Sequence, residues 1–164
     1  MIEDILVKLF EHNNWANLQI IQACSALGDE QLDAEPPSAT QGSIRSTLMH
    51  LVSSQRGYLS LLTVPVEERL QAASAITDLQ ESARLSGEGL LALMKEEHKF
   101  PKTRLQTTDG YYVEPWVVVL QVINHATEHR EQIKSMLSAL GVNPPDIDGW
   151  DYGEATNALI PIST

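Results

Sequence analysis

The sequence feature that most constrains the fold is a long amphipathic stretch from Pro115 to Leu140. Proline suits the first position of a helix, and Gly141 followed by Pro144 provides a stop signal at the other end. With a turn of about 100° per residue, one face of this helix is apolar and comprises Val119, Val122, Ile123, Ala126, Ile133, Met136, Leu137 and Leu140. The pattern predicts one long helix that buries a single face.

Two histidines, His125 and His129, lie at the edge of that apolar face. Residues four apart are neighbours on a helix surface, so both imidazoles can reach one metal ion. The other interpretation is a pair of histidines at the edge of the core whose ring nitrogens are hydrogen-bonded within the protein. The spacing alone leaves both interpretations open, and a third ligand from elsewhere in the chain would favour a metal site.

Three further stretches, 2–27, 43–62 and 79–97, show the helical spacing of apolar residues. Gly28 is expected at the C′ position of the first helix, and Ser43 is expected to cap the second. Four helices of this length predict an all-α fold, a four-helix bundle. The remaining segments are a loop at 28–42, an ambiguous segment at 63–76 that permits a short helical turn, a short hairpin around Asp109 and Gly110, and an irregular tail from Val142.

Composition narrows the class of protein and of partner. The chain has 164 residues and a formal net charge of −11, which opposes binding to a nucleic-acid backbone. We expect one domain spanning 1–164. Cys24 is the only cysteine, the first residues are acidic where a signal peptide would be basic, and no apolar run is long enough to span a membrane. These features predict a cytoplasmic protein with no membrane partner.

Polar residues also occupy inward-facing positions on the first two predicted helices. His50 belongs to a mostly polar facet with Thr47, Ser54 and Gly57, which leaves room around its imidazole. Taken alone, His50 is more often an ordinary helix histidine. Asn13 falls at the centre of the apolar face of helix 2–27, with Asn17 to one side, so these amides either are satisfied by packed neighbours or face a central pocket.

Trp15 points roughly away from the apolar face of its helix, which suggests burial against something else, such as a second subunit. His12 and His98 lie outside these patterns and are expected to be solvated.

Functional sites in a four-helix bundle are built from inward-facing groups on neighbouring helices, so His50 can meet His125 and His129. Three neutral imidazoles hold Zn²⁺ or a similar divalent ion and leave positions for water or substrate. The sequence therefore predicts an open metal site rather than a closed structural one.

Three other polar residues are candidates for contacts to the ligands, a cofactor or a substrate. Gln132 lies beside His125 on the helical wheel, Arg130 lies toward the other edge of the apolar face, and Asn13 comes from the first helix. The alternative is that they are polar helix-packing residues, or an arginine with a buried stem and a solvated head.

Three segments resemble the signature segments of the DinB/YfiT-like family of four-helix-bundle proteins, in the same order and at similar spacing. They are HNNWAN at 12–17, GSIRSTLMHL at 42–51 and INHATEHREQI at 123–133. In that family one histidine of the second helix and two of the last bind a divalent metal, and the matching positions are His50, His125 and His129. The chain departs from the family where Glu128 replaces a frequent histidine and Glu131 a glycine, both on the predicted outer face.

The resemblance also implies functions. Some family members are transferases that use a low-molecular-weight thiol, others look hydrolytic, and many are stress-response proteins without an assigned reaction, so the fold does not settle the chemistry. We expect a metal-dependent transferase or hydrolase acting on a small-molecule substrate, or a non-catalytic metal- or ligand-binding protein. A divalent metal ion is expected, and the sequence does not distinguish Zn, Ni, Fe and Mn. A homodimer is expected from the resemblance and from Trp15. Cys24 lies in an apolar face and is a poor nucleophile.

Overall fold

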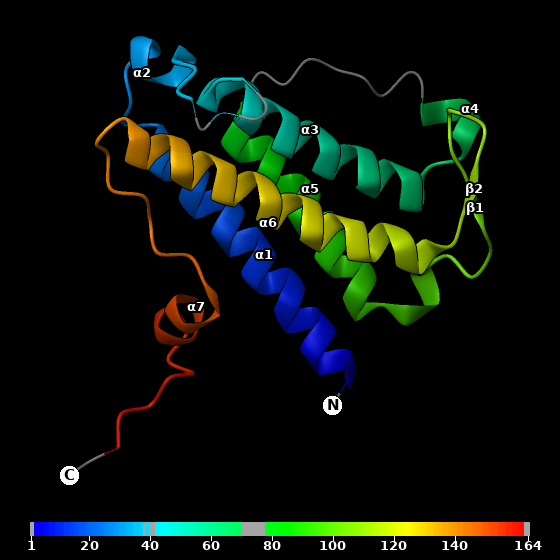
Figure 1. Ribbon diagram of the computed structural model, residues 1–164. Helices are drawn as coiled ribbons and strands as arrows, with labels where there is room; N and C mark the ends of the chain where they lie inside the picture. The colour runs from blue at the N-terminus through cyan, green and yellow to red at the C-terminus, as the bar shows by residue number, and fades with distance from the viewer. Residues whose placement is uncertain (1, 38, 40–41, 70–77, 163–164) are drawn as a thin grey trace.

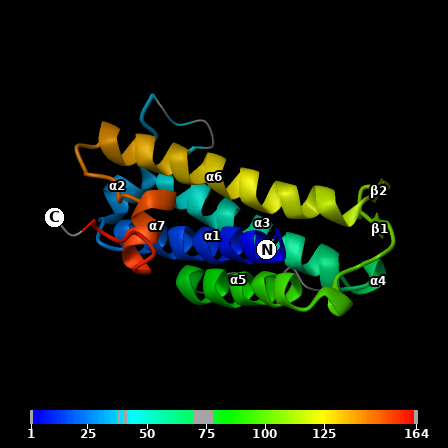
Figure 2. The same cartoon turned by 90° about the horizontal axis from the view of Figure 1, so that it is seen from below.

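The structure is a computed structural model that describes residues 2–37, 39, 42–69 and 78–162. Its long helices are α1 (Ile2–Cys24), α3 (Ile44–Thr63), α5 (Leu79–Lys95) and α6 (Pro115–Ala139). α1 packs against α5 and α6, and α3 packs against the same two helices (Figure 1). α1 and α6 run in one direction and α3 and α5 in the other (Figures 1 and 2). The predicted all-α four-helix bundle is confirmed.

Local sequence accounts for where the long helices begin and end. The Ser43 side chain caps α3 by accepting from the Ser46 backbone N–H, and Asp78 caps α5 in the same way. Pro115 occupies the first turn of α6, where a backbone N–H is not needed. Gly141 follows α6 with a φ of +73°, a left-handed conformation that glycine adopts without strain.

Two segments that were expected to be irregular contain short helices, α2 (Asp29–Asp33) and α7 (Gly149–Ala155). Gly28 is correspondingly not a C′ residue, because its φ of −75° is extended and it forms the N-cap of α2. Asp148 caps α7 by accepting from the backbone N–H groups of Trp150 and Asp151. Helices of five and seven residues are too short to show a hydrophobic period. The sequence signal for them is the capping-box pattern at their first turns.

The C-terminal segment folds back so that α7 lies against α1 (Figures 1 and 2). His12 donates from Nε2 to the Ile147 carbonyl at 2.9 Å, so the expectation that His12 is solvated is wrong. The Trp15 ring lies 5.4 Å from the Tyr152 ring, which places the packing partner of Trp15 in its own chain. Trp15 therefore no longer supports a homodimer. His98 has an exposed side chain, as expected.

The remaining elements lie at the end of the bundle where α3 ends and α6 begins (Figure 1). The short helical turn permitted in segment 63–76 is present as α4 (Val66–Arg69), while 70–76 lie outside the described residues. The 3₁₀ turn η1 (Glu97–Lys99) follows α5, which ends two residues earlier than the pattern predicts. The predicted hairpin is confirmed: β1 (Leu105–Gln106) pairs antiparallel with β2 (Tyr112–Val113).

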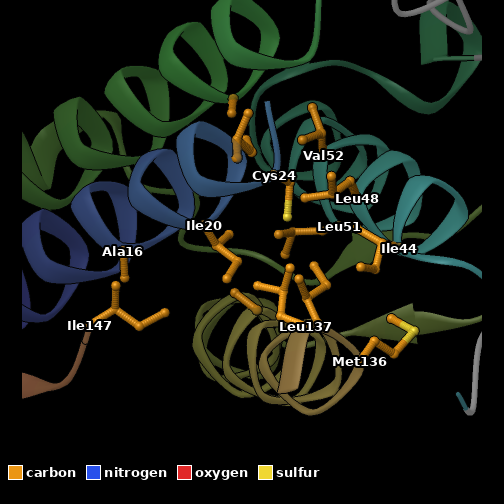
Figure 3. Packing of buried hydrophobic residues seen from close by; sticks show 14 residues of the cluster. Ala16, Ile20, Cys24, Ile44, Leu48, Leu51, Val52, Met136, Leu137 and Ile147 are labelled. Carbon is orange, nitrogen blue, oxygen red and sulfur yellow. The ribbon is translucent and has the colours of Figure 1, made fainter. Parts of the chain in front are cut away.

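Apolar side chains form two clusters along the bundle. In the first, side chains of α1, α3 and α6 converge and Ile147 of the tail packs on Ala16 (Figure 3). The second joins Phe10 to residues of α3, α5 and α6. Cys24 is buried in the first cluster, and burial raises the pKa of its thiol to about 12. None of the described helices combines the length and apolar character needed to cross a bilayer.

Candidate metal site

Three imidazoles meet between α3 and α6. The Nε2 atom of His125 lies 3.1 Å from Nε2 of His50 and 3.1 Å from Nε2 of His129. All three candidate ligand atoms lie within 4.8 Å of one another. Two nitrogens bound to one Zn²⁺ ion at about 2.05 Å are separated by about 2.9 Å at a right angle and about 3.3 Å at a tetrahedral angle. Both distances to His125 therefore fit a shared divalent ion, and the predicted convergence of the three histidines is present.

Exposure increases across the cluster. His129 is 4% exposed, His125 is half-buried and His50 is exposed. The buried histidine anchors the cluster in the bundle, while the exposed one leaves a side from which solvent or a small molecule can approach. This is the arrangement of an open site rather than a sealed structural one.

Gln132 fixes the orientation of the buried histidine. Its Oε1 accepts from Nδ1 of His129 at 2.8 Å, one turn further along α6. A proton on Nδ1 leaves the lone pair of His129 on Nε2, the atom that faces His125. The predicted place of Gln132 beside the histidine cluster thus corresponds to a hydrogen bond that orients one candidate ligand.

The electrostatic environment favours the neutral form of His50 and His125. Burial lowers the pKa of His125 to about 4, and the nearby His129 and His50 add to this effect. Burial, followed by the influence of His129, also lowers the pKa of His50. Both imidazoles are therefore unprotonated at neutral pH, which is the form that binds a metal ion.

Arg130 faces α1. It is 4% exposed and donates to the side-chain oxygens of Asn13 at 2.8 Å and Asn17 at 2.7 Å, both on α1. Burial lowers the pKa of Arg130 to about 10, so the guanidinium stays charged at neutral pH. The structure therefore joins Asn13 and Arg130 to each other, and contacts of either residue to a cofactor stay a prediction.

The same polar layer continues through the other two long helices. Asn17 donates to Gln55 Oε1 at 2.7 Å, and Gln55 donates to Ser86 Oγ at 2.8 Å and to the Ala83 carbonyl at 2.9 Å. Sequence reasoning missed Gln55 and Ser86, although both are polar residues at inward-facing helix positions. Together these bonds connect α1, α3, α5 and α6.

Tyr58 is another residue that sequence reasoning did not assign to the site. Its ring meets the His125 ring edge-on, with centroids 5.7 Å apart. Burial raises the pKa of Tyr58, the Gln121 side chain beside its hydroxyl opposes that rise, and the Glu128 carboxylate adds to it. The available signal was the spacing of eight residues from His50, which places both on one face of α3.

Comparisons with known proteins agree with this fold. The family model of the DinB family matches residues 1–161. The protein named DinB of Bacillus subtilis (strain 168) is 28% identical over 153 residues, covering 85% of this chain and 88% of that protein. A crystal structure assigned to the DinB family, from Exiguobacterium sibiricum 255-15, matches with a TM-score of 0.63 at 17% identity and covers 85% of this chain and 91% of that one. At that identity the structural likeness concerns the fold alone.

Proposed function

The chain belongs to the DinB family, and from this premise we propose that it is a divalent-metal-dependent enzyme acting on a small molecule. The observation that carries the proposal is the convergence of three imidazoles with 3.1 Å between neighbouring Nε2 atoms and one exposed side. Imidazole ligands suit several divalent ions, so Zn, Ni, Fe and Mn are all candidates.

The histidines and Gln132 have different roles in this proposal. His50, His125 and His129 would hold the ion, and Gln132 keeps His129 in the tautomer that presents Nε2. A divalent ion bound there would supply a Lewis acid that lowers the pKa of a water or a thiol. The exposed His50 leaves the approach from solvent open.

The proposed reaction is transfer to or from a low-molecular-weight thiol, or hydrolysis of a small substrate. Cys24 does not supply the nucleophile, since it is buried in the apolar cluster and burial raises its pKa to about 12. The thiol or water would therefore come from solution, and the chain contributes binding and orientation.

The test is turnover by the metal-loaded protein across a panel of thiol-transfer and hydrolytic substrates. We expect His129→Ala to abolish turnover while the bundle stays folded, and Cys24→Ser to retain it. Loss of turnover in metal-loaded Cys24→Ser would instead indicate a protein thiol as nucleophile. No turnover in the metal-loaded wild type would favour the second candidate, a non-catalytic metal- or ligand-binding protein.

A further inference from the structure

A chain of buried hydrogen bonds crosses the bundle and joins its four long helices. Arg130 on α6 donates to Asn17 on α1 at 2.7 Å, and Asn17 donates to Gln55 on α3 at 2.7 Å. Gln55 in turn donates to Ser86 on α5 at 2.8 Å. All four side chains are buried. This polar network therefore connects the helix that carries two of the candidate ligands with the helix that carries the third.

Arg130 makes the network depend on the orientation of α6. Its guanidinium is a buried cation, and its described acceptors are the neutral oxygens of Asn13, Asn17 and Thr127. A rotation or slide of α6 against α1 would take the guanidinium away from both asparagines and leave a buried charge short of acceptors. The hydrogen bonds therefore favour one placement of α6 on α1.

Apolar packing does not restrict the helices to the same degree. Apolar contacts are non-directional, and a core of suitable volume loses its single arrangement before it loses stability. Hydrogen bonds depend on both distance and angle. A metal site accepts deviations of only about 0.2 Å in its metal–ligand distances, and Nε2 of His50 meets Nε2 of His125 across the boundary between α3 and α6. The site therefore needs the directional restriction that the polar network provides.

We propose that Arg130, Asn17 and Gln55 are positioning residues, which hold α3 and α6 in the arrangement that places His50 beside the histidine pair of α6. The network joins these helices close to the candidate ligands. Arg130 follows His129 directly on α6, and Gln55 lies five residues after His50 on α3. The inference rests on the proposed function, because it explains how the same metal site keeps its geometry.

The experiment measures Co²⁺ affinity by competition with a metal-binding dye, and circular dichroism checks folding. Gln55→Met keeps the length of the side chain and removes its hydrogen bonds to α1 and α5. We expect this change to weaken Co²⁺ binding by about 5- to 30-fold, the range typical of substitutions along a coupled network, and to shift the visible absorption band of the bound ion. Ser86→Ala is the milder variant, because Gln55 keeps the Ala83 carbonyl as an acceptor. It should have a smaller effect in the same direction, although α5 carries none of the three histidines.

Leu93→Ala is the matched control for lost stability. Leu93 is buried on α5, as Ser86 is, but it packs in the second apolar cluster with Phe10. Its truncation should lower the urea midpoint about as much as Gln55→Met does and leave the Co²⁺ affinity within about twofold of the wild-type value. If Leu93→Ala weakens Co²⁺ binding as much as Gln55→Met does, a general loss of stability explains the effect and the positioning role is wrong.

A second readout needs no metal, since ¹⁵N NMR of the histidine rings distinguishes a proton on Nδ1 from one on Nε2. In the metal-free wild type we expect a single set of ring signals, with the proton of His129 on Nδ1, where Gln132 accepts it. Gln55→Met should give a mixture of ring signals, because His50 and His125 no longer keep one arrangement. A single, unchanged set of signals together with an unchanged Co²⁺ affinity would overturn the inference. If the wild type does not bind Co²⁺, the proposed function is wrong, and the ring signals alone decide whether the network positions the histidines.

Discussion

Replacing Gln132 with leucine should weaken the binding of a divalent ion by about 10- to 100-fold while the bundle stays folded. The Nδ1 atom of His129 donates to Gln132 at 2.8 Å, and His129 is only 4% exposed, so water cannot easily replace the lost acceptor. Without an acceptor for the proton on Nδ1, the tautomer of His129 that has a free Nε2 is no longer favoured. A 10- to 100-fold loss corresponds to about 1.4 to 2.7 kcal/mol of binding free energy.

The assay is a competition titration against a zinc-binding dye at constant pH, with circular dichroism to check folding. Gln80→Leu is the matched control, since Gln80 is an exposed residue of α5. Gln132→Glu should bind zinc at least as tightly as the wild type, because a carboxylate accepts the same hydrogen bond and strengthens the ligand. A dissociation constant for Gln132→Leu within about twofold of the wild-type value, well below the effect expected from a lost supporting group, would refute this reasoning.

Four further predictions concern the scaffold. In urea unfolding, Gly57→Ala should raise the unfolding free energy by up to about 1 kcal/mol, because its added Cβ meets nothing within 4 Å. Gly87→Ala should lower the unfolding free energy by about 1 to 2 kcal/mol. Its added Cβ would lie 2.7 Å from Oδ1 of Asn14, whose amide donates to the Gly87 carbonyl. A stabilised Gly87→Ala variant would contradict this packing. Cys24 should resist a thiol reagent at pH about 8 until the protein unfolds, because burial raises its pKa to about 12, and prompt labelling of the folded protein would contradict its burial. The metal-free protein should lose stability as the pH falls from about 6.5 to about 4. The reason is that the unfolded chain protonates His125 near its ordinary pKa of 6.5, while the folded chain holds that pKa at about 4. If the urea midpoint falls as steeply with pH in His125→Gln, the loss of stability comes from other groups.

The long helices could be predicted because each is amphipathic over several turns, as in the stretch from Pro115 to Leu140. The short helices α2 and α7 could not, since five to seven residues carry no period and depend on caps such as Asp148. The packing of α7 on α1 could likewise not be predicted from the sequence, because the contact between His12 and the Ile147 carbonyl joins residues far apart in the chain.

The histidine cluster was predictable from its spacing and the bundle geometry, with the family resemblance deciding between interpretations. The environment of Arg130 was not, because an arginine ordinarily keeps its head in water and here the guanidinium is buried. Its bonds to Asn13 and Asn17 depend on the pairing of α1 with α6, which helical periodicity does not specify. Tyr58 was missed for a similar reason, since an aromatic residue on an inward face is usually part of the core.

The central claim is that His50, His125 and His129 bind one divalent ion, and the most direct measurement is metal content. Protein purified without an affinity tag would be loaded with Zn²⁺, dialysed and analysed by mass spectrometry for metal per chain. We expect about one ion per chain in the wild type and in His98→Ala, whose exposed imidazole lies outside the cluster. We expect loss of the ion in His50→Ala and His125→Ala. A wild type that retains no metal, or cluster variants that retain as much as the wild type, would contradict the account.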